Sequence, residues 1–99
     1  MDMKFVDYKA LAREIEAKVV REFRTDLAND LVVEDDIGYQ AMLISDAGDM
    51  LNVCRYISWG DFAEATRVWQ RMDTSPRETL AWYIEEIAGS EFFDTMLAD

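Results

Sequence analysis

The chain has 99 residues, of which 21 are Asp or Glu and 10 are Lys or Arg, and it contains no His and one Cys. A chain of this length forms one domain, which we expect to span residues 1–99. Its net charge of −11 argues against direct binding to nucleic acid. The absence of His removes the commonest general base and metal ligand.

The composition is that of a folded protein, because 51% of the residues are apolar and 12% are aromatic. The single Cys54 cannot form an intramolecular disulfide, which indicates a reducing, cytosolic setting, and we expect this side chain in the core. The chain starts without the basic and apolar segments of a signal peptide, and no apolar run approaches the roughly 18 residues of a membrane span. We therefore expect a soluble cytoplasmic protein that does not contact a membrane.

Helical spacing of apolar residues over positions 8–23 predicts an N-terminal amphipathic helix. The residues that keep this spacing are Tyr8, Leu11, Ala12, Ile15, Val19 and Phe23. Asp7 is expected to cap the helix at its start. The pair Asn29 and Asp30 is expected to end it, because both residue types tolerate turn conformations.

Residues 31–57 admit two interpretations. Two apolar segments flank Asp46-Ala-Gly-Asp49, whose glycine can supply the positive φ of a short hairpin loop, so we predict an antiparallel β-hairpin over about residues 39–57. Residues 31–33 are expected to add a third, short strand. The competing interpretation is a helix from Asp36 to Ile57, which would hold Gly48 in its interior at a cost of about 1 kcal/mol relative to Ala. The residues that roughly keep helical spacing in this alternative are Ile37, Ala41, Ile44, Leu51 and Cys54.

The last third of the chain predicts two to three helices. The segment Ser58-Trp-Gly-Asp61 resembles a capping box with Asp in place of Glu. Ser75-Pro-Arg-Glu78 carries a stronger start signal, with Ser as the cap, Pro at the first helical position and Glu three residues after the cap. Gly89 is expected to end that helix, and Ser90 to open a short terminal one. An N-terminal helix, a small antiparallel β-sheet and two to three C-terminal helices make an α+β domain.

The negative charge is confined to two blocks of the sequence. Residues 1–24 and 55–77 each carry a net charge of +1, whereas residues 25–54 carry −7 and residues 78–99 carry −6, and neither of these two blocks contains Lys or Arg. Carboxylates three or four residues apart on a helix can occupy Lys and Arg side chains that otherwise hold phosphates, and a surface of one sign speeds association with a basic partner. The alternative is that the charge serves only solubility. The candidate partner contacts are Asp26, Asp30, Glu34, Asp35, Asp36, Asp46, Asp49, Glu78, Glu85, Glu86, Glu91 and Asp94.

No pattern typical of an active site is present in the sequence. The four glycines do not form a phosphate-binding loop, one Cys without His excludes a zinc site of thiolates and imidazoles, and the serines lack a His partner. Glu34-Asp-Asp36 could gather a hard cation with Asp46 or Asp49, but the spacing is not that of an EF-hand, and we interpret the segment as a solvated turn. We expect a protein that is not an enzyme and that holds neither a metal nor a cofactor.

In size, acidity and architecture, the chain resembles the small phage-encoded inhibitors of host defence, the anti-CRISPR and anti-restriction proteins, several of which act as nucleic-acid mimics. The resemblance covers the whole chain as a profile of 99 residues with acidic blocks at 26–49 and 78–99, and no diagnostic motif accompanies it. It implies a basic protein partner, either a nuclease or a subunit of a CRISPR or restriction complex. It also implies action in the cytosol of the host bacterium, with the acids named above as contacts.

Two other functions fit the same sequence. An immunity protein or antitoxin that neutralises a basic nuclease toxin would share the electrostatics, although the Tyr-Tyr-Pro signature of colicin immunity proteins is absent. A structural or assembly protein would associate with itself through exposed apolar surface, which leaves a homodimer open.

Overall fold

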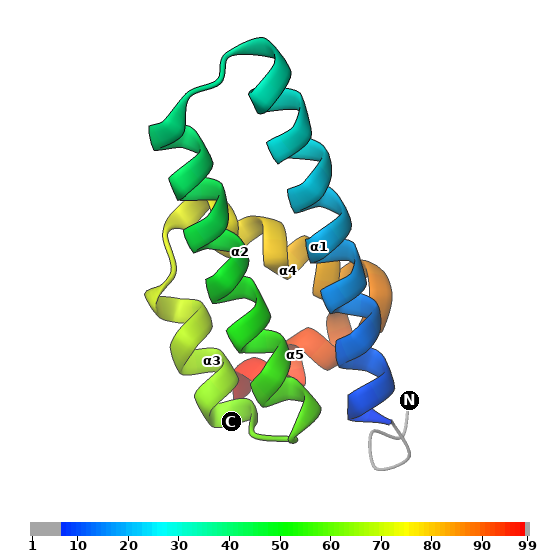
Figure 1. Cartoon of the computed structure of the whole chain (residues 1–99). Helices are drawn as coiled ribbons and strands as arrows, with labels where there is room; N and C mark the ends of the chain where they lie inside the picture. Colours follow the sequence, from blue (N-terminus) through cyan, green and yellow to red (C-terminus); the bar gives the residue numbers. More distant parts are fainter. Residues whose placement is uncertain (1–6, 99) are drawn as a thin grey trace.

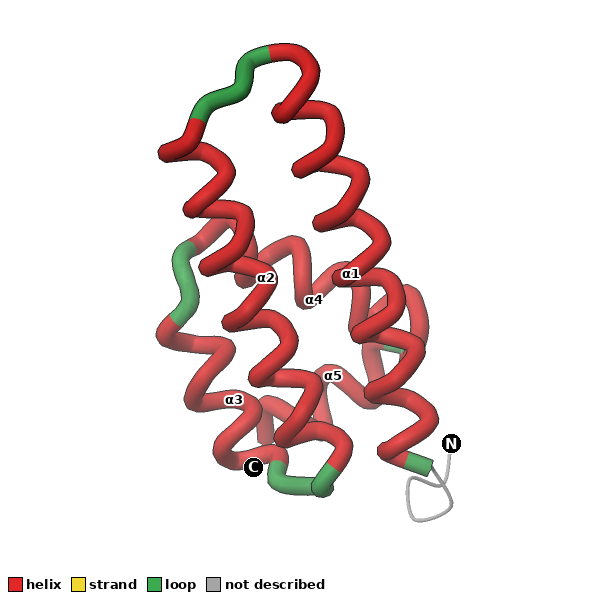
Figure 2. The backbone as a smooth tube through the Cα atoms, in the orientation of Figure 1, coloured by secondary structure: helices red, strands yellow, loops and turns green. Residues whose placement is uncertain are grey.

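In the computed structural model, which is described for residues 7–98, five α-helices and no strand make up the described part of the chain (Figures 1 and 2). The predicted α+β class is therefore wrong, and the fold is all-helical. The helices are α1 (Tyr8–Val33), α2 (Ile37–Ser58), α3 (Phe62–Arg71), α4 (Thr74–Ala88) and α5 (Ser90–Ala98). None of them is long and apolar enough to cross a membrane.

The largest correction concerns the predicted hairpin at residues 39–57, because this stretch lies within the single helix α2. The predicted third strand at residues 31–33 is also wrong, since these residues form the last turn of α1. Gly48 sits in the middle of α2 and not in a loop. Burial of Val53 and Ile57 on the inner face of α2 offsets the penalty for a helical glycine, since each buried side chain of this size contributes about 1.5–3 kcal/mol.

Helix α1 begins as predicted and ends later than predicted. The carboxylate of Asp7 accepts hydrogen bonds from the backbone N–H groups of Lys9 at 3.1 Å and Ala10 at 3.2 Å, which confirms the N-cap. The predicted end at residues 29–30 is wrong, because the helix continues to Val33. The reason is that the side chain of Asp30 is buried and bonded to groups beyond the helix, so it does not act locally as a turn former.

The C-terminal helices follow one another in the predicted order, but α3 and α4 begin at other residues than predicted. Ser58 belongs to α2, and the N-cap of α3 is Asp61, whose carboxylate accepts from the backbone N–H of Glu64 at 3.2 Å. Helix α4 begins at Thr74, so Ser75 is helical and does not cap it. Gly89, with φ of 90°, ends α4, and α5 begins at the next residue, as predicted.

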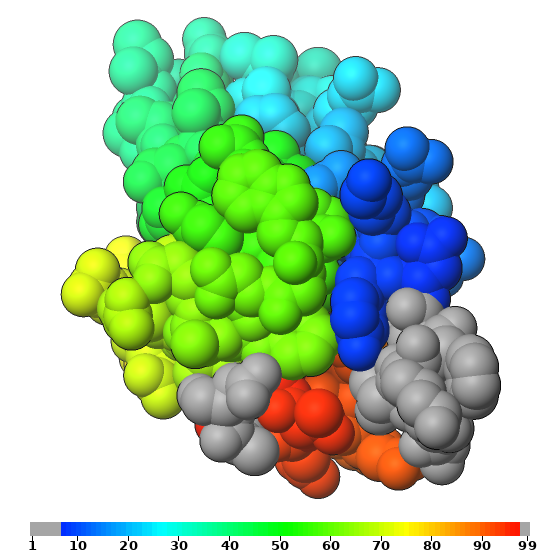
Figure 3. Space-filling model, turned by 90° about the horizontal axis from the view of Figure 1, so that it is seen from below, coloured from blue at the N-terminus to red at the C-terminus, as the bar shows by residue number. Residues whose placement is uncertain are grey.

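Helices α1 and α2 form a long antiparallel hairpin, and the other three helices cover only the half of it that is nearer the termini (Figure 1). We define the hairpin tip as residues 26–39. The tip extends beyond α3, α4 and α5, which gives the molecule extents of 46 × 22 × 19 Å. Figure 3 shows the opposite end, where α3 and α5 lie side by side.

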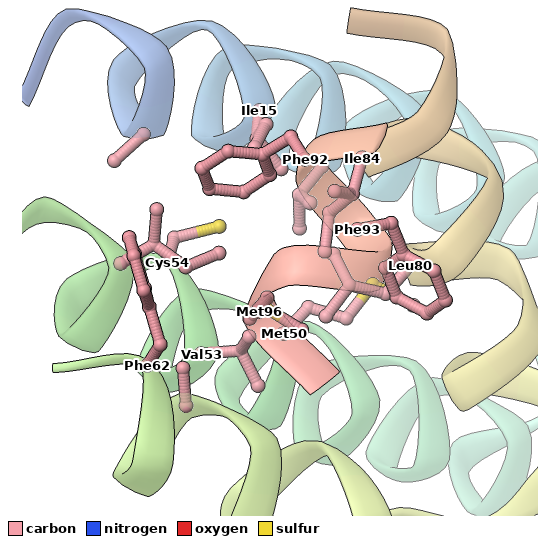
Figure 4. Close-up of a cluster of buried hydrophobic side chains, with 14 of the residues drawn as sticks. Ile15, Met50, Val53, Cys54, Phe62, Leu80, Ile84, Phe92, Phe93 and Met96 are labelled. Atoms are coloured by element: carbon pink, nitrogen blue, oxygen red, sulfur yellow. The ribbon is translucent and has the colours of Figure 1, made fainter. Parts of the chain in front are cut away.

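The apolar core lies at the end away from the hairpin tip, and side chains from all five helices converge there (Figure 4). Among residues 20–49, no apolar side chain is buried. Phe92 is 1% exposed and meets the ring of Phe62 edge to face, with 5.6 Å between ring centroids. The buried apolar residues are Ala12, Ile15, Val19, Met50, Val53, Cys54, Ile57, Phe62, Ala65, Met72, Leu80, Ile84, Phe92, Phe93 and Met96.

Truncation of Phe92 tests whether α5 contributes to this core. We expect Phe92→Ala to lower the free energy of unfolding by about 3–5 kcal/mol, because it removes a buried ring and leaves a cavity. Urea unfolding followed by circular dichroism measures the change. The matched control is Trp82→Ala, whose ring is 67% exposed and whose removal should change stability by less than about 0.5 kcal/mol. Equal losses in the two variants would contradict the packing of α5.

Candidate docking surface at the hairpin tip

The structure gathers most of the first acidic block at the hairpin tip. Asp46 and Asp49 lie further along α2, nearer the covered half of the hairpin. All seven acids therefore belong to the α1–α2 hairpin, which Figure 1 shows in blue, cyan and green. The acids of the tip itself are Asp26, Asp30, Glu34, Asp35 and Asp36.

The second acidic block lies elsewhere on the molecule. Glu78, Glu85 and Glu86 lie on α4, and Glu91 and Asp94 lie on α5. Because α5 is at the end opposite the tip, the two blocks are not brought together into one surface at the tip (Figure 1). Glu86 instead forms an ion pair with Lys18 of α1, which ties α4 to the hairpin.

Asp30 differs from the other candidate contacts because it is buried, with 5% of its surface exposed. Its carboxylate accepts hydrogen bonds from the backbone N–H of Asp36 at 3.1 Å and from Nε2 of Gln40 at 3.0 Å. Its backbone carbonyl accepts from the N–H groups of Glu34 and Asp35. Asp30 therefore holds the turn between the two helices and is not available to a partner.

The remaining acids of the tip are exposed. Asp35 has φ of 48°, a left-handed conformation that Asp tolerates better than most residues, and its carboxylate accepts from Nε2 of Gln40 at 3.1 Å. Asp36 caps α2 by accepting from the backbone N–H of Tyr39 at 3.2 Å. Across residues 7–98, no tip acid forms an ion pair with Lys or Arg. Each exposed carboxylate thus retains free lone pairs for a cationic partner.

Two hollows share Asp26 and Tyr39 on one side of the hairpin. The first, of about 430 Å³, lies between the ends of α1 and α2, and its lining includes Asp26 and Glu34. The second, of about 210 Å³, lies between α1, α2 and the start of α4, with Phe23 and Pro76 among the residues that line it. The pair of hollows offers carboxylates beside apolar atoms, an arrangement that suits the ammonium group and the alkyl stem of Lys or the guanidinium of Arg.

Asp46 lines the second hollow, where its surroundings disfavour the charged form of its carboxyl group. Burial, followed by the like charges of Asp73 and Asp49, raises the pKa of its carboxyl group above the ordinary value. Burial also raises the pKa of the Cys54 thiol to about 12, with a further contribution from Glu16, so this cysteine is an unreactive core residue, as predicted. Within the described ranges, no three acidic, Cys or His side chains converge as the ligands of a metal ion do.

The candidate contacts derived from charge left out the apolar residues of the tip. Val32 is 85% exposed, Val33 65% and Leu31 52%, and Ile37 at the start of α2 is 79% exposed. Three consecutive apolar residues cannot all face inward in a helix, so their exposure could have been predicted only after residues 31–33 were recognised as helical. The tip therefore presents carboxylates interspersed with apolar side chains.

No protein-family model matches the chain, and neither a curated protein nor a solved structure does. The resemblance to phage-encoded inhibitors stays an expectation drawn from size and charge. The function therefore has to be inferred from the geometry and charge of the described residues.

Removal of the Asp30 carboxylate should destabilise the whole hairpin turn. We expect Asp30→Ala to lower the free energy of unfolding by about 1–3 kcal/mol, because a backbone N–H and a side-chain amide lose their partner. Thermal unfolding by circular dichroism measures the change, and Asp26→Ala, at an exposed acid one turn earlier, is the control that should stay within about 0.5 kcal/mol. If both variants melt alike, Asp30 does not hold the turn.

Neutralisation of Asp46 should stabilise the fold at neutral pH. A carboxyl whose pKa is raised by folding favours the native state when protonated, and this contribution is lost as the pH rises through the folded pKa. Asp46→Asn is therefore expected to raise Tm at pH 7, with a gain that shrinks toward zero as the pH falls below the carboxyl range. Glu85→Gln makes the same change in net charge at an exposed site and controls for it. A gain in Tm that does not depend on pH would contradict the raised pKa of this carboxyl group.

Proposed function

We propose that this chain is a small acidic binding protein that docks its hairpin tip on a basic, nucleic-acid-binding surface of a nuclease or a defence complex, and so inhibits it. The second acidic block, on α4 and α5, is assigned a supporting role in long-range attraction. The action requires no catalysis, since a protein that occupies the Lys and Arg side chains of such a surface excludes the nucleic acid by competition.

The observation that supports this proposal is the set of exposed tip acids that form no ion pair with Lys or Arg among the described residues. Like charges on adjacent helical turns destabilise a helix by about 0.2–0.5 kcal/mol per pair. The tip has no apolar core to offset that repulsion. A purely solubilising charge would be less costly if it were spread over the better-packed half of the molecule, so its concentration at the tip favours a binding role.

The exposed apolar residues of the tip favour a second candidate, an immunity protein or antitoxin with one cognate toxin. A mimic of nucleic acid needs mainly charge, whereas Leu31, Val32 and Val33 offer apolar area that only a shaped protein pocket would bury. Both candidates share a basic protein partner, and they differ in how strongly binding depends on salt.

The test compares two triple variants as baits. Asp26→Asn, Glu34→Gln and Asp35→Asn together remove three exposed charges and leave Asp30 and Asp36 to hold the turn. We expect this variant to bind basic nuclease or CRISPR-complex proteins, captured from bacterial lysate at low salt and then purified, about tenfold or more weakly than the wild type. Calorimetric titration measures the affinity, and DNA should compete with the wild-type chain for the purified partner.

The matched control carries the same loss of three charges in the second block, through Glu85→Gln, Glu91→Gln and Asp94→Asn. This control should bind within about threefold of the wild type, because screening weakens charges that lie further than a Debye length from the contact. Equal weakening in both variants would show that only net charge matters. Undiminished binding by the tip variant would contradict docking through the tip, and binding that salt does not weaken would favour the immunity function.

A further inference from the structure

One face of α2 is largely uncovered in the described part of the chain, although it carries an ordered apolar pattern, and Leu51 is the residue of this face that also packs against the core. Residues alternately four and three positions apart share this face, as in the seam of a coiled coil. Ile37 is 79% exposed and Ile44 is 58% exposed, which is unusual for a regular apolar stripe. We name this face the outer stripe; it consists of Ile37, Ala41, Ile44, Gly48, Leu51 and Arg55.

Large and small residues alternate along the outer stripe, and Gly48 is the clearest case. A Cβ atom added at Gly48 would meet no atom within 4 Å, so nothing inside the described chain requires a glycine at this position. Glycine weakens a helix interior, but it lets another backbone or side chain approach closely. Gly48 thus leaves open space on the surface of α2, one turn away from the exposed side chain of Ile44.

We propose that a second copy of the chain covers the outer stripe, with its α2 antiparallel to the first about a two-fold axis. In the register that overlaps the whole stripe, Ile44 of one copy rests on Gly48 of the other, and Leu51 of one copy rests on Ala41 of the other. In these two pairs each large side chain meets a small one, Ile37 lies opposite Arg55 at the ends of the stripe, and the two-fold axis repeats every contact. A stripe whose own pattern is self-complementary identifies a second copy as the occupant.

The charges agree with the same arrangement. Arg55 is exposed and is the basic residue in the last turn of α2. In the antiparallel register it lies beside the start of the other copy's α2, where Glu34, Asp35 and Asp36 cluster. The exposed flanking residues Ser45 and Asn52 are uncharged, so the two stripes can approach each other without bringing carboxylates of α2 face to face.

This dimer does not depend on the proposed inhibitory function, but a partner at the tip would compete with the contact between Arg55 of the other copy and the acids at the start of α2. Tyr39 and Asp46 line the hollows on the side of α2 that faces α4, away from the outer stripe. A dimer through the stripe leaves that side open and presents two hairpin tips at opposite ends. The chain can therefore prove monomeric in solution and still bind a basic partner, or form the dimer and bind no such partner.

The first test is the mass in solution over a concentration series, measured by sedimentation equilibrium. We expect the wild type to approach twice its 11.5 kDa mass as its concentration rises. Gly48→Leu fills the space for the other copy's Ile44 and should raise the dimer dissociation constant about tenfold or more, with Tm of the separated chain unchanged or higher because Leu favours a helix. Ala17→Leu, at an exposed position on α1, is the control that should leave the constant unchanged. A wild type that stays monomeric, or equal constants for all three proteins, would overturn the proposal.

The second test reads the direction and register. Proteins carrying Ile44→Cys or Gly48→Cys are mixed and oxidised with oxidised glutathione, and the buried Cys54 does not compete. The antiparallel arrangement predicts that the disulfide between the two different variants forms faster than that of Ile44→Cys with itself. A parallel dimer would join each variant to its own kind, and that result would overturn the proposed geometry even if the mass doubles.

Discussion

The α1–α2 hairpin must close at its tip without an apolar core, and the buried carboxylate of Asp30 provides that closure. Burial of a charged group is unfavourable unless hydrogen bonds replace its hydration. Asp30 receives them from the backbone N–H of Asp36 and from Gln40, while its own carbonyl accepts from the two residues that follow α1. The bond to Asp36 places the residue that caps α2, so the direction in which the second helix leaves the turn depends on one side chain of the first.

The two halves of the α1–α2 hairpin contribute differently: one half provides the stability of the fold, and the other provides the exposed charged surface. The half of the hairpin near the termini is covered by α3, α4 and α5 and contains the aromatic cluster around Phe92. The other half is held by polar contacts and carries exposed carboxylates together with exposed Val32 and Ile37. Segments with few buried apolar contacts open at lower free energy than the core, so the tip can adapt to a partner without unfolding the rest.

How far the sequence could predict this structure depends on whether the decisive contacts were local. Asp7, Gly89 and Ser90 act on neighbouring residues, and their roles could be predicted from the sequence. The two acidic blocks could also be located, but the burial of Asp30 could not, because its partners lie six and ten residues ahead across a turn that was expected elsewhere. A glycine between two apolar segments is typical of a hairpin loop, but burial along the inner face of α2 outweighs the helical penalty of this one glycine.

Gly48, which led to the wrong prediction of a hairpin, also lies on the outer stripe of α2. A helix that only had to cover the core would be more stable with Ala at position 48, where an added Cβ meets nothing. Its inner face, with Met50, Val53 and Ile57, lies in the core, and Leu51 is the residue of the outer stripe that also packs against it. Both the glycine and the exposed Ile44 are unfavourable in an isolated chain, and each becomes favourable when the stripe packs against a copy of itself. Gly48 and the exposed Ile44 each make the monomer less stable than it could be. Their spacing lets each compensate the other across a two-fold axis, so a single contact between two copies explains both residues more simply than two unrelated causes would.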